Sequence, residues 1–186
     1  MLIIMKNKMI SLKKQTAIII DGPMGSGKTT VANIIHRKIK KMVYLGTDKI
    51  KWLQSDFKRS DKEIFISIEV VLSMADTYLK NEMNILLAEN IIDREVRNKF
   101  IDLFNKNKLQ LFIYHLSAPK KTLLERLNKR GKEHEKKGIP PISKPFILRN
   151  LNSHHENREK NAKVLDSSEK TPEEIAGIIL KEIRNN

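Results

Sequence analysis

The chain has 186 residues, carries a formal net charge of +14 and contains no cysteine. This length suits one domain, residues 1–186, which can bury roughly 70% of its unfolded surface without a disulfide or metal staple. The absence of cysteine excludes thiolate chemistry and Cys-ligated zinc, and it predicts a reducing, cytoplasmic location. The apolar segment Met1 to Ile10 is interrupted by Lys6 and Lys8 and is too short to span a membrane. We expect an irregular extension or an early start site there.

Half of the net positive charge lies in one stretch. Between Lys120 and Lys160 there are 12 Lys or Arg against 5 Glu, a net charge of +7. This concentration predicts anionic ligands at one edge of the fold. Aromatic residues make up only 5% of the chain and do not alternate with basic ones. That composition argues against a stacking platform for single-stranded nucleic acid.

The first predicted element is a buried strand that leads into a phosphate-binding loop. Thr16 to Asp21 contains a continuous apolar run, which is typical of a parallel strand. The next eight residues, GPMGSGKT, match the pattern G-x-x-x-x-G-K-[ST], and apolar spacing predicts a helix over Thr30 to Lys41. In this setting backbone N–H groups bind a phosphate, Lys28 reaches the β- and γ-phosphates, and Thr29 can bind Mg²⁺. The predicted nucleoside triphosphate site consists of Gly22, Gly25, Ser26, Gly27, Lys28, Thr29 and Thr30.

Strand and helix patterns alternate along the rest of the chain, which predicts one α/β domain with a parallel sheet. The later strands are expected at Met42–Leu45, Asn84–Glu89, Leu109–Leu116 and Ala162–Asp166.

Three further features mark where helices begin and end. Capping-box sequences at Ser60 and Thr171 predict two helix starts, and the first of these helices has an apolar face that includes Ile68 and Val71. A helix is expected to end near Arg130. The glycine- and proline-containing stretch Gly131 to Pro145 then predicts a mobile loop.

Several classes of protein use such a nucleotide-binding loop, and the sequence excludes most of them. The segment Asn105 to Lys108 lacks the Asp of the base-recognition motif of GTPases, and an Asp-x-x-Gly switch is absent. The chain is too short for a two-lobed helicase and has no Leu-Ser-Gly-Gly signature of transporter ATPases. A small phosphotransferase remains.

Three segments resemble the small P-loop kinases in chain order: Thr16 to Ile35, Leu111 to Arg130, and Val164 to Glu174. This superfamily includes kinases for nucleoside monophosphates, shikimate, gluconate, antibiotics and polynucleotide 5′ ends, and the zeta-toxin type. The resemblance implies a P-loop three-layer α/β sandwich with a five-stranded parallel sheet in the order 2-3-1-4-5. It also implies ATP and Mg²⁺ as cofactors, acceptor-side helices at about 49–83 and a lid at about 131–145.

The resemblance also assigns acceptor-side residues. Asp48 matches an Asp that contacts the acceptor hydroxyl in these kinases, and a carboxylate there can orient the hydroxyl and accept its proton; the alternative is a helix N-cap. Glu89 matches an acidic residue near Mg²⁺ or the acceptor, and the carboxyl ends of parallel strands converge on the ligand. Arg97 is the expected acceptor-side cation, with an ion pair to Asp93 as its alternative.

A basic pair is assigned to the nucleotide side. Arg126 and Arg130 share one helix face, and the resemblance implies that they lie near adenine and the phosphates. A guanidinium can bind two oxygens of the transferred phosphoryl group. His154 and His155 are adjacent and project in different directions on a helix, so we expect surface residues there and not metal ligands.

The sequence leaves the acceptor open. IIIDGPMGSGKTTVA resembles the start of cytidylate kinases, although Gly46 and Asp48 are exchanged relative to their Tyr-Leu-Asp-Thr-Gly segment and Asn150 replaces an acidic residue. We expect an ATP-dependent kinase for a small anionic or nucleoside-like acceptor, with no membrane partner. A polynucleotide 5′ end is a further possible acceptor. The alternatives are a cytidylate-type nucleoside monophosphate kinase and a regulatory module that hydrolyses ATP slowly.

Overall fold

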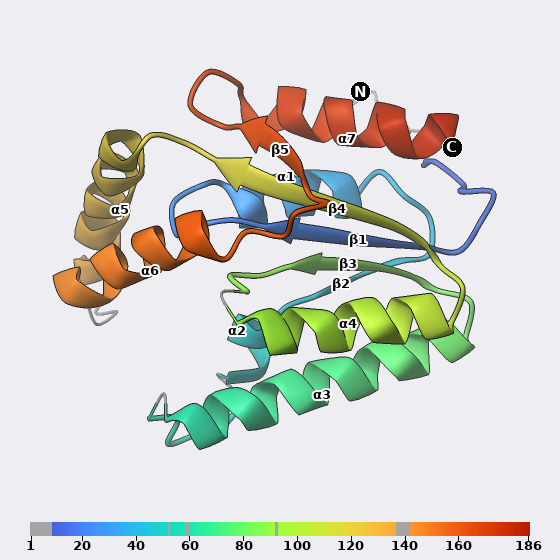
Figure 1. Cartoon of the computed structure of the whole chain (residues 1–186), viewed down its shortest axis with the longest axis horizontal. Coiled ribbons are helices and arrows are strands. Elements are labelled where there is room, and N and C mark those ends of the chain that lie inside the picture. The colour runs from blue at the N-terminus through green and yellow to red at the C-terminus, as the bar shows by residue number, and fades with distance from the viewer. Residues whose placement is uncertain (1–8, 52, 59, 92, 137–141) are drawn as a thin grey trace, which may run out of the picture.

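A parallel sheet forms the centre of the protein (Figure 1). The computed structural model describes residues 9–51, 53–58, 60–91, 93–136 and 142–186, apart from the side chains of 155 and 156. These residues form a five-stranded sheet in the order β2-β3-β1-β4-β5, and every neighbouring pair is parallel. The predicted fold class and strand order are therefore confirmed. The strands are β1 (Thr16–Asp21), β2 (Met42–Leu45), β3 (Asn84–Ala88), β4 (Gln110–Ser117) and β5 (Lys163–Asp166).

Successive side chains of β1 point to opposite faces of the sheet, so the core has two layers. Ile18 and Ile20 face α1 (Lys28–His36) and α7 (Pro172–Asn185). Ala17 and Ile19 face the opposite layer, formed by α3 (Asp61–Lys80) and α4 (Arg94–Lys106) (Figure 1). All six residues of β1 are buried, because helices cover both faces of the central strand.

Both predicted capping boxes are present. Ser60 accepts a hydrogen bond from the backbone N–H of Glu63, whose side chain bonds back to the Ser60 N–H. Thr171 and Glu174 form the same reciprocal pair at the start of α7. These local bonds satisfy backbone donors that a helix start otherwise leaves unpaired, and for that reason the sequence marks them well.

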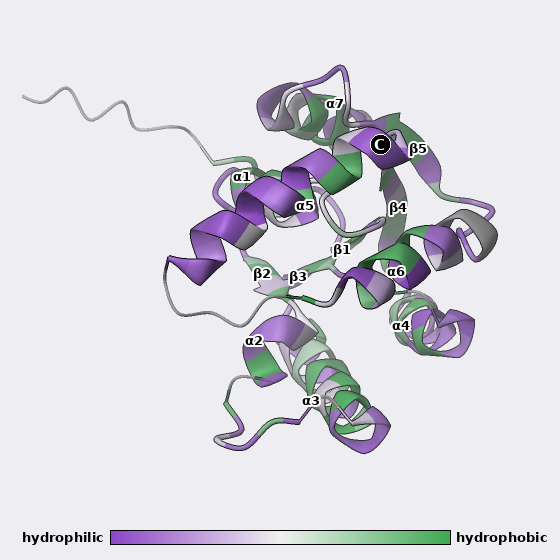
Figure 2. Cartoon of the chain, turned by 90° about the vertical axis from the view of Figure 1, so that its left-hand side faces the viewer, coloured by the Kyte–Doolittle hydropathy of each residue, from purple (hydrophilic) through white to green (hydrophobic). Residues whose placement is uncertain are grey.

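Three helices lie at the carboxyl ends of the strands: α2 (Thr47–Lys51), α5 (Lys120–Glu135) and α6 (Lys144–Glu156) (Figures 1 and 2). Two expectations about this region are wrong. The fifth helix continues through Gly131 to Glu135 and does not end near Arg130. A single glycine costs a helix only about 1 kcal/mol, and good helix formers follow it.

The second error concerns the end of the predicted loop, because α6 already begins at Lys144. Ser143 is its N-cap and Pro145 lies in its first turn, where the missing N–H of proline is harmless. The predicted loop and lid over 131–145 thus begin and end in helices, and residues 137–141 lie outside the described part of the chain. Movement of this region as a lid stays a prediction.

Of the predicted irregular extension from Met1 to Ile10, residues 1–8 lie outside the described part of the chain. Ile10 forms an isolated parallel bridge with Ile39, with hydrogen bonds to Lys38 and Lys40. The first helix ends at His36, earlier than expected, and Lys41 has a positive φ of 54°. Among the described residues, no helix is both long and apolar enough to cross a membrane.

Candidate active site

The loop between β1 and α1 has the backbone geometry of a phosphate-binding loop. Gly22, Gly25 and Gly27 all have positive φ angles, of 143°, 83° and 95°. A Cβ atom on Gly22 would lie 2.3 Å from the backbone carbonyl oxygen of Leu116, so only glycine fits there. Lys28 begins α1 directly after the loop, which places the loop at the N-terminus of a helix.

The side chain of Lys28 folds over this loop. Its Nζ donates hydrogen bonds to the carbonyl oxygens of Gly22, at 2.8 Å, and Pro23, at 3.0 Å. Burial lowers the pKa of Lys28 to about 8, against the opposing effect of the carboxylates of Asp21, Glu89 and Asp48. A phosphate bound beside Nζ would add negative charge and favour the protonated form. Thr29 and Thr30 are exposed in the next residues of the helix.

Two predicted acidic residues lie on the adjoining strand ends. Glu89 follows β3 and accepts hydrogen bonds from the backbone N–H of Thr47 and from its Oγ1, the latter at 3.0 Å. Burial and the charge of Asp48 raise the pKa of Glu89. Asp48 lies in the first turn of α2, where its side chain is 90% exposed and pairs with Lys51 Nζ at 3.2 Å. The structure therefore does not support the alternative that Asp48 is the N-cap, because Thr47 already belongs to the helix.

Arg126 fixes α5 to the phosphate-binding loop. Its guanidinium donates to the carbonyl oxygen of Ser167 at 2.6 Å, to the Ser167 Oγ at 3.2 Å and to the carbonyl oxygen of Gly25 at 3.3 Å. Arg130 lies one turn further along the helix and is exposed. The two arginines of the predicted pair therefore differ in environment. Arg126 joins the phosphate-binding loop to the segment at Ser167, and the side chain of Arg130 is exposed to solvent.

Arg97 is buried, with only 1% of its side chain exposed. Its Nε lies 3.1 Å from a carboxylate oxygen of Glu159, and its Nη1 donates to the carbonyl oxygen of Asn157 at 3.0 Å. Asp93 does not pair with it but caps α4. A role of Arg97 in acceptor binding stays a prediction, and the structure gives the guanidinium protein partners.

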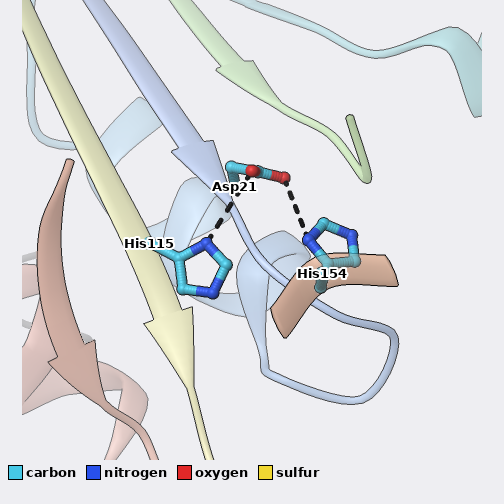
Figure 3. A group of neighbouring side chains, drawn as sticks. All are labelled: Asp21, His115 and His154. Carbon is cyan, nitrogen blue, oxygen red and sulfur yellow. Dashed lines mark ion pairs between the residues drawn. The ribbon is translucent and has the colours of Figure 1, made fainter. Parts of the chain in front are cut away.

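Sequence reasoning missed a group of buried polar residues beside the loop (Figure 3). Asp21 ends β1 and lies close to His115 of β4 and His154 of α6. The expectation that His154 is a surface residue is wrong, because the side chain is 2% exposed; the side chain of His155 lies outside the described part of the structure. Asn150, one turn before His154, accepts a hydrogen bond from the N–H of Met24 at 3.0 Å.

The charge states of this group follow from its burial. Burial alone would raise the pKa of Asp21, but the two histidines and a hydrogen bond from the Gly22 N–H hold it below its usual value. Burial lowers the pKa of His154 to about 4 despite the nearby carboxylate. Near pH 7, Asp21 is therefore a carboxylate and His154 is a neutral imidazole.

A phosphate-binding loop between β1 and α1 of a 2-3-1-4-5 parallel sheet defines the P-loop kinase fold. Residues 18–159 match the family model described as an AAA domain, so the chain belongs to that family. These residues include the loop, both acidic residues and α6.

Two relatives with curated names match part of the chain. Both are bifunctional pantoate ligase/cytidylate kinases from Prochlorococcus marinus, strains MIT 9215 and AS9601. Each is 36% identical over 85 residues, which cover 38% of this chain. The match spans only 16% of the length of either relative.

Solved structures share the fold over almost the whole chain. The protein APE1195 superposes with a TM-score of 0.69 at 18% identity, covering 94% of this chain and 97% of that one. A sugar kinase from Janibacter sp. HTCC2649 gives a TM-score of 0.63 at 17% identity, with coverages of 90% and 93%. The APS kinase of Mycobacterium tuberculosis, solved with AMPPNP and APS, gives 0.62 at 17% identity, with coverages of 93% and 99%. At this identity the likeness establishes the fold.

Proposed function

We propose that this protein is an ATP-dependent phosphotransferase that moves the γ-phosphoryl group to a hydroxyl or phosphate of a small acceptor. The observation that carries the proposal is the arrangement around Lys28. Its ammonium group lies at the loop that would hold the phosphates, and Asp48 and Glu89 exert an electrostatic effect on it from the adjoining strand ends. Phosphoryl transfer needs cations around the phosphates and a group that orients the nucleophile. The cysteine-free chain also fits a reducing cytoplasm.

The roles on the nucleotide side follow from chemistry. The backbone N–H groups of the loop would bind the phosphates, and Lys28 would stabilise charge on the transferred group. Thr29 and Glu89 supply oxygen atoms at the loop and at the end of β3, which are donors that Mg²⁺ accepts. When bound, Mg²⁺ neutralises charge on the β- and γ-phosphates. Arg126 would keep α5 against the loop, and Arg130 would reach the phosphates.

The acceptor side offers one exposed carboxylate. Asp48 would orient the acceptor hydroxyl and accept its proton as the new P–O bond forms. Arg97 would supply positive charge to the acceptor side from its buried position next to Asp21. The acceptor itself would be anionic or nucleoside-like, as the positive charge of the chain suggests, and a polynucleotide 5′ end stays among the possible acceptors.

A cytidylate-type nucleoside monophosphate kinase is the second candidate. Its support is the sequence match to the two bifunctional enzymes, which have cytidylate kinase in their names.

An acceptor screen tests the proposal. ADP release from Mg–ATP should rise with one class among nucleosides, nucleoside monophosphates, sugars, shikimate-like acids, aminoglycosides and 5′-hydroxyl oligonucleotides. Lys28→Ala should lower that rate by roughly 10²- to 10³-fold, because an electrostatic contact to the transferred group is lost. If no acceptor stimulates turnover and ATP instead controls binding of a partner, the regulatory alternative is correct. Undiminished turnover in folded Lys28→Ala would exclude the kinase proposal.

A further inference from the structure

Asp21, His115 and His154 form a buried group, which we call the Asp–His group. Asp21 and His115 are register partners on the neighbouring strands β1 and β4, so their side chains leave the same face of the sheet. His154 reaches them from α6 (Figure 3). The exposed fractions of the three side chains are 1%, 6% and 2%. The group lies directly before the phosphate-binding loop, and the proposed phosphotransfer does not use it.

The contacts within the Asp–His group are too long for hydrogen bonds. Asp21 Oδ2 lies 3.8 Å from His115 Nδ1, and Asp21 Oδ1 lies 3.9 Å from His154 Nδ1. Hydrogen bonds between such atoms span 2.7 to about 3.2 Å. Within the described residues, Asp21 Oδ2 and His115 Nδ1 have no hydrogen-bond partner although both are buried. Leaving buried polar atoms unpaired is unfavourable, because each has lost its hydrogen bonds to water.

Asn90 fixes the orientation of one imidazole. Its Oδ1 contacts His154 Nε2, and with the amide in this orientation the oxygen accepts and Nε2 carries the hydrogen. The lone pair of His154 then lies on Nδ1, which faces the carboxylate of Asp21. Two electron-pair donors that face each other repel unless a cation lies between them. An imidazole that donates its second N–H to an oxygen is the usual arrangement of a metal-bound histidine.

We propose that the Asp–His group binds one divalent transition-metal ion, Zn²⁺, through Asp21 and the Nδ1 atoms of His115 and His154. The potential ligand atoms all lie within 4.8 Å of one another. Zinc takes bonds of about 2.0–2.2 Å to nitrogen and oxygen, so tetrahedral ligands lie about 3.4 Å apart. The two Asp–His separations of 3.8 and 3.9 Å, which involve different carboxylate oxygens, would have to shorten by about half an ångström. The largest separation in the ligand set is at most 4.8 Å and would have to shorten more. Three protein ligands leave a fourth position for water.

Two carboxylates and two positive charges surround the Asp–His group. Arg97 Nη1 lies 3.9 Å from Asp21 Oδ2 and would oppose a metal ion. Its guanidinium is already paired with Glu159 at 3.1 Å. Lys28 is a second positive charge that acts on Asp21 and His154, so Asp21, Glu159, Arg97 and Lys28 together carry no net charge before an ion binds. Asp21 Oδ1 also accepts a hydrogen bond from the Ile91 N–H at 3.2 Å, which holds the carboxylate in position.

A bound ion would join α6 to the strand that precedes the phosphate-binding loop. The same helix already contacts the loop through Asn150 and the Met24 N–H. The ion would therefore hold α6 against the loop. This structural role of the ion would depend neither on the acceptor nor on turnover. Its nitrogen ligands distinguish it from the Mg²⁺ position at Thr29 and Glu89, where only oxygen atoms are offered.

Zinc titration of the full, tag-free chain after chelator treatment, without nucleotide, tests this inference. A chromophoric chelator should report one Zn²⁺ per chain at micromolar concentration, retained in excess Mg²⁺. His154→Gln should weaken binding strongly, and Asn90→Ala by roughly 10- to 100-fold, because it removes the oxygen that orients the imidazole. His36→Gln removes an exposed histidine of α1 and should leave binding unchanged.

Histidine ring ¹⁵N spectra of the wild-type protein give a result that does not depend on whether a variant folds. Zinc should shift Nδ1 of His115 and His154 and leave the rings of His36 and His134 unchanged. Failure to bind zinc at micromolar concentration, displacement by Mg²⁺, or shifts confined to the other histidines would each overturn the proposal.

Discussion

The two acidic residues at the strand ends have different freedom to act. Glu89 is engaged by the backbone N–H and hydroxyl of Thr47, so it holds the start of α2 in place. Asp48 extends from the same helix into solvent, and among the described residues its one ion pair is with Lys51. We therefore expect Asp48, and not Glu89, to meet the acceptor hydroxyl.

Asp48→Asn tests that assignment. If Asp48 accepts the proton of the hydroxyl, the acceptor-dependent rate should fall by roughly 10²-fold, the range typical of a lost general base. ATP affinity and melting temperature should hardly change, because the amide has the shape of the carboxylate and the side chain is exposed. Steady-state kinetics, nucleotide titration and thermal unfolding measure the three quantities.

Asp56→Asn is the matched control for this substitution. Asp56 is also exposed and contacts the side chain of Gln54, outside the strand ends. It should leave the rate unchanged. If Asp48→Asn and Asp56→Asn behave alike, Asp48 has no part in phosphoryl transfer.

The element α3 shows how one helix can combine a buried face with an exposed apolar one. Ile68 and Val71 lie in the core, as the sequence predicted, and Ala75 lies there with them. Phe65 and Val70 are exposed, at 51% and 37%, and border an open groove of about 600 Å³ along the helix. Hydrophobicity alone therefore does not tell which valine of the pair Val70–Val71 supports the fold.

The two valines allow a direct comparison. Val71→Ala should lower the free energy of unfolding by about 2 kcal/mol, because it removes buried methyl groups and leaves a cavity. Val70→Ala should change it by less than about 0.5 kcal/mol. Helix propensity changes equally in both variants and cancels. Urea unfolding measures the difference, and equal effects would contradict the orientation of α3.

At the scale of the whole molecule, positive charge collects around the candidate active site. The exposed residues Lys129, Arg130 and Lys132 belong to α5, which lies at the carboxyl ends of the strands and is strongly hydrophilic (Figure 2). Charges of one sign beside a binding site raise the association rate of an oppositely charged ligand. The helix thus gives the charge concentration seen in the sequence a definite place next to the phosphate-binding loop.

Charge reversal on α5 should slow nucleotide association. Lys129→Glu with Lys132→Glu should lower the association rate of Mg–ATP by roughly threefold to tenfold at low salt. The difference from wild type should shrink as salt shortens the screening length to about 8 Å. Stopped-flow measurements with a fluorescent ATP analogue report the rate.

A matched pair of reversals separates local from overall charge. Lys106 and Lys181 are exposed near the C-terminal ends of α4 and α7, at the opposite end of the molecule from α5 (Figure 1). Lys106→Glu with Lys181→Glu should leave the association rate nearly unchanged. An equal reduction by both pairs would show that only net charge matters.

Features that depend on short-range interactions could be predicted from the sequence. The phosphate-binding loop requires glycines at fixed spacing and a helix that starts at Lys28. Neighbouring residues of the sequence indicate both features. The capping boxes at Ser60 and Thr171 close within four residues, so they too were predictable. The strand order followed from resemblance to a known fold, because alternation of elements predicts a parallel sheet but not its order.

Which polar residues are buried together depends on contacts between segments that are distant in the sequence. The Met24–Asn150 hydrogen bond joins residues 126 positions apart, and His154 is buried because α6 packs over the end of β1. Arg97 likewise meets Asp21 and Glu159 only after α4 covers the sheet. Arginine is mostly exposed and histidine has intermediate burial in folded proteins, so no local pattern marks these residues as buried. Their environment depends on how distant segments pack. That packing is set by the free energy of the whole fold, not by local sequence.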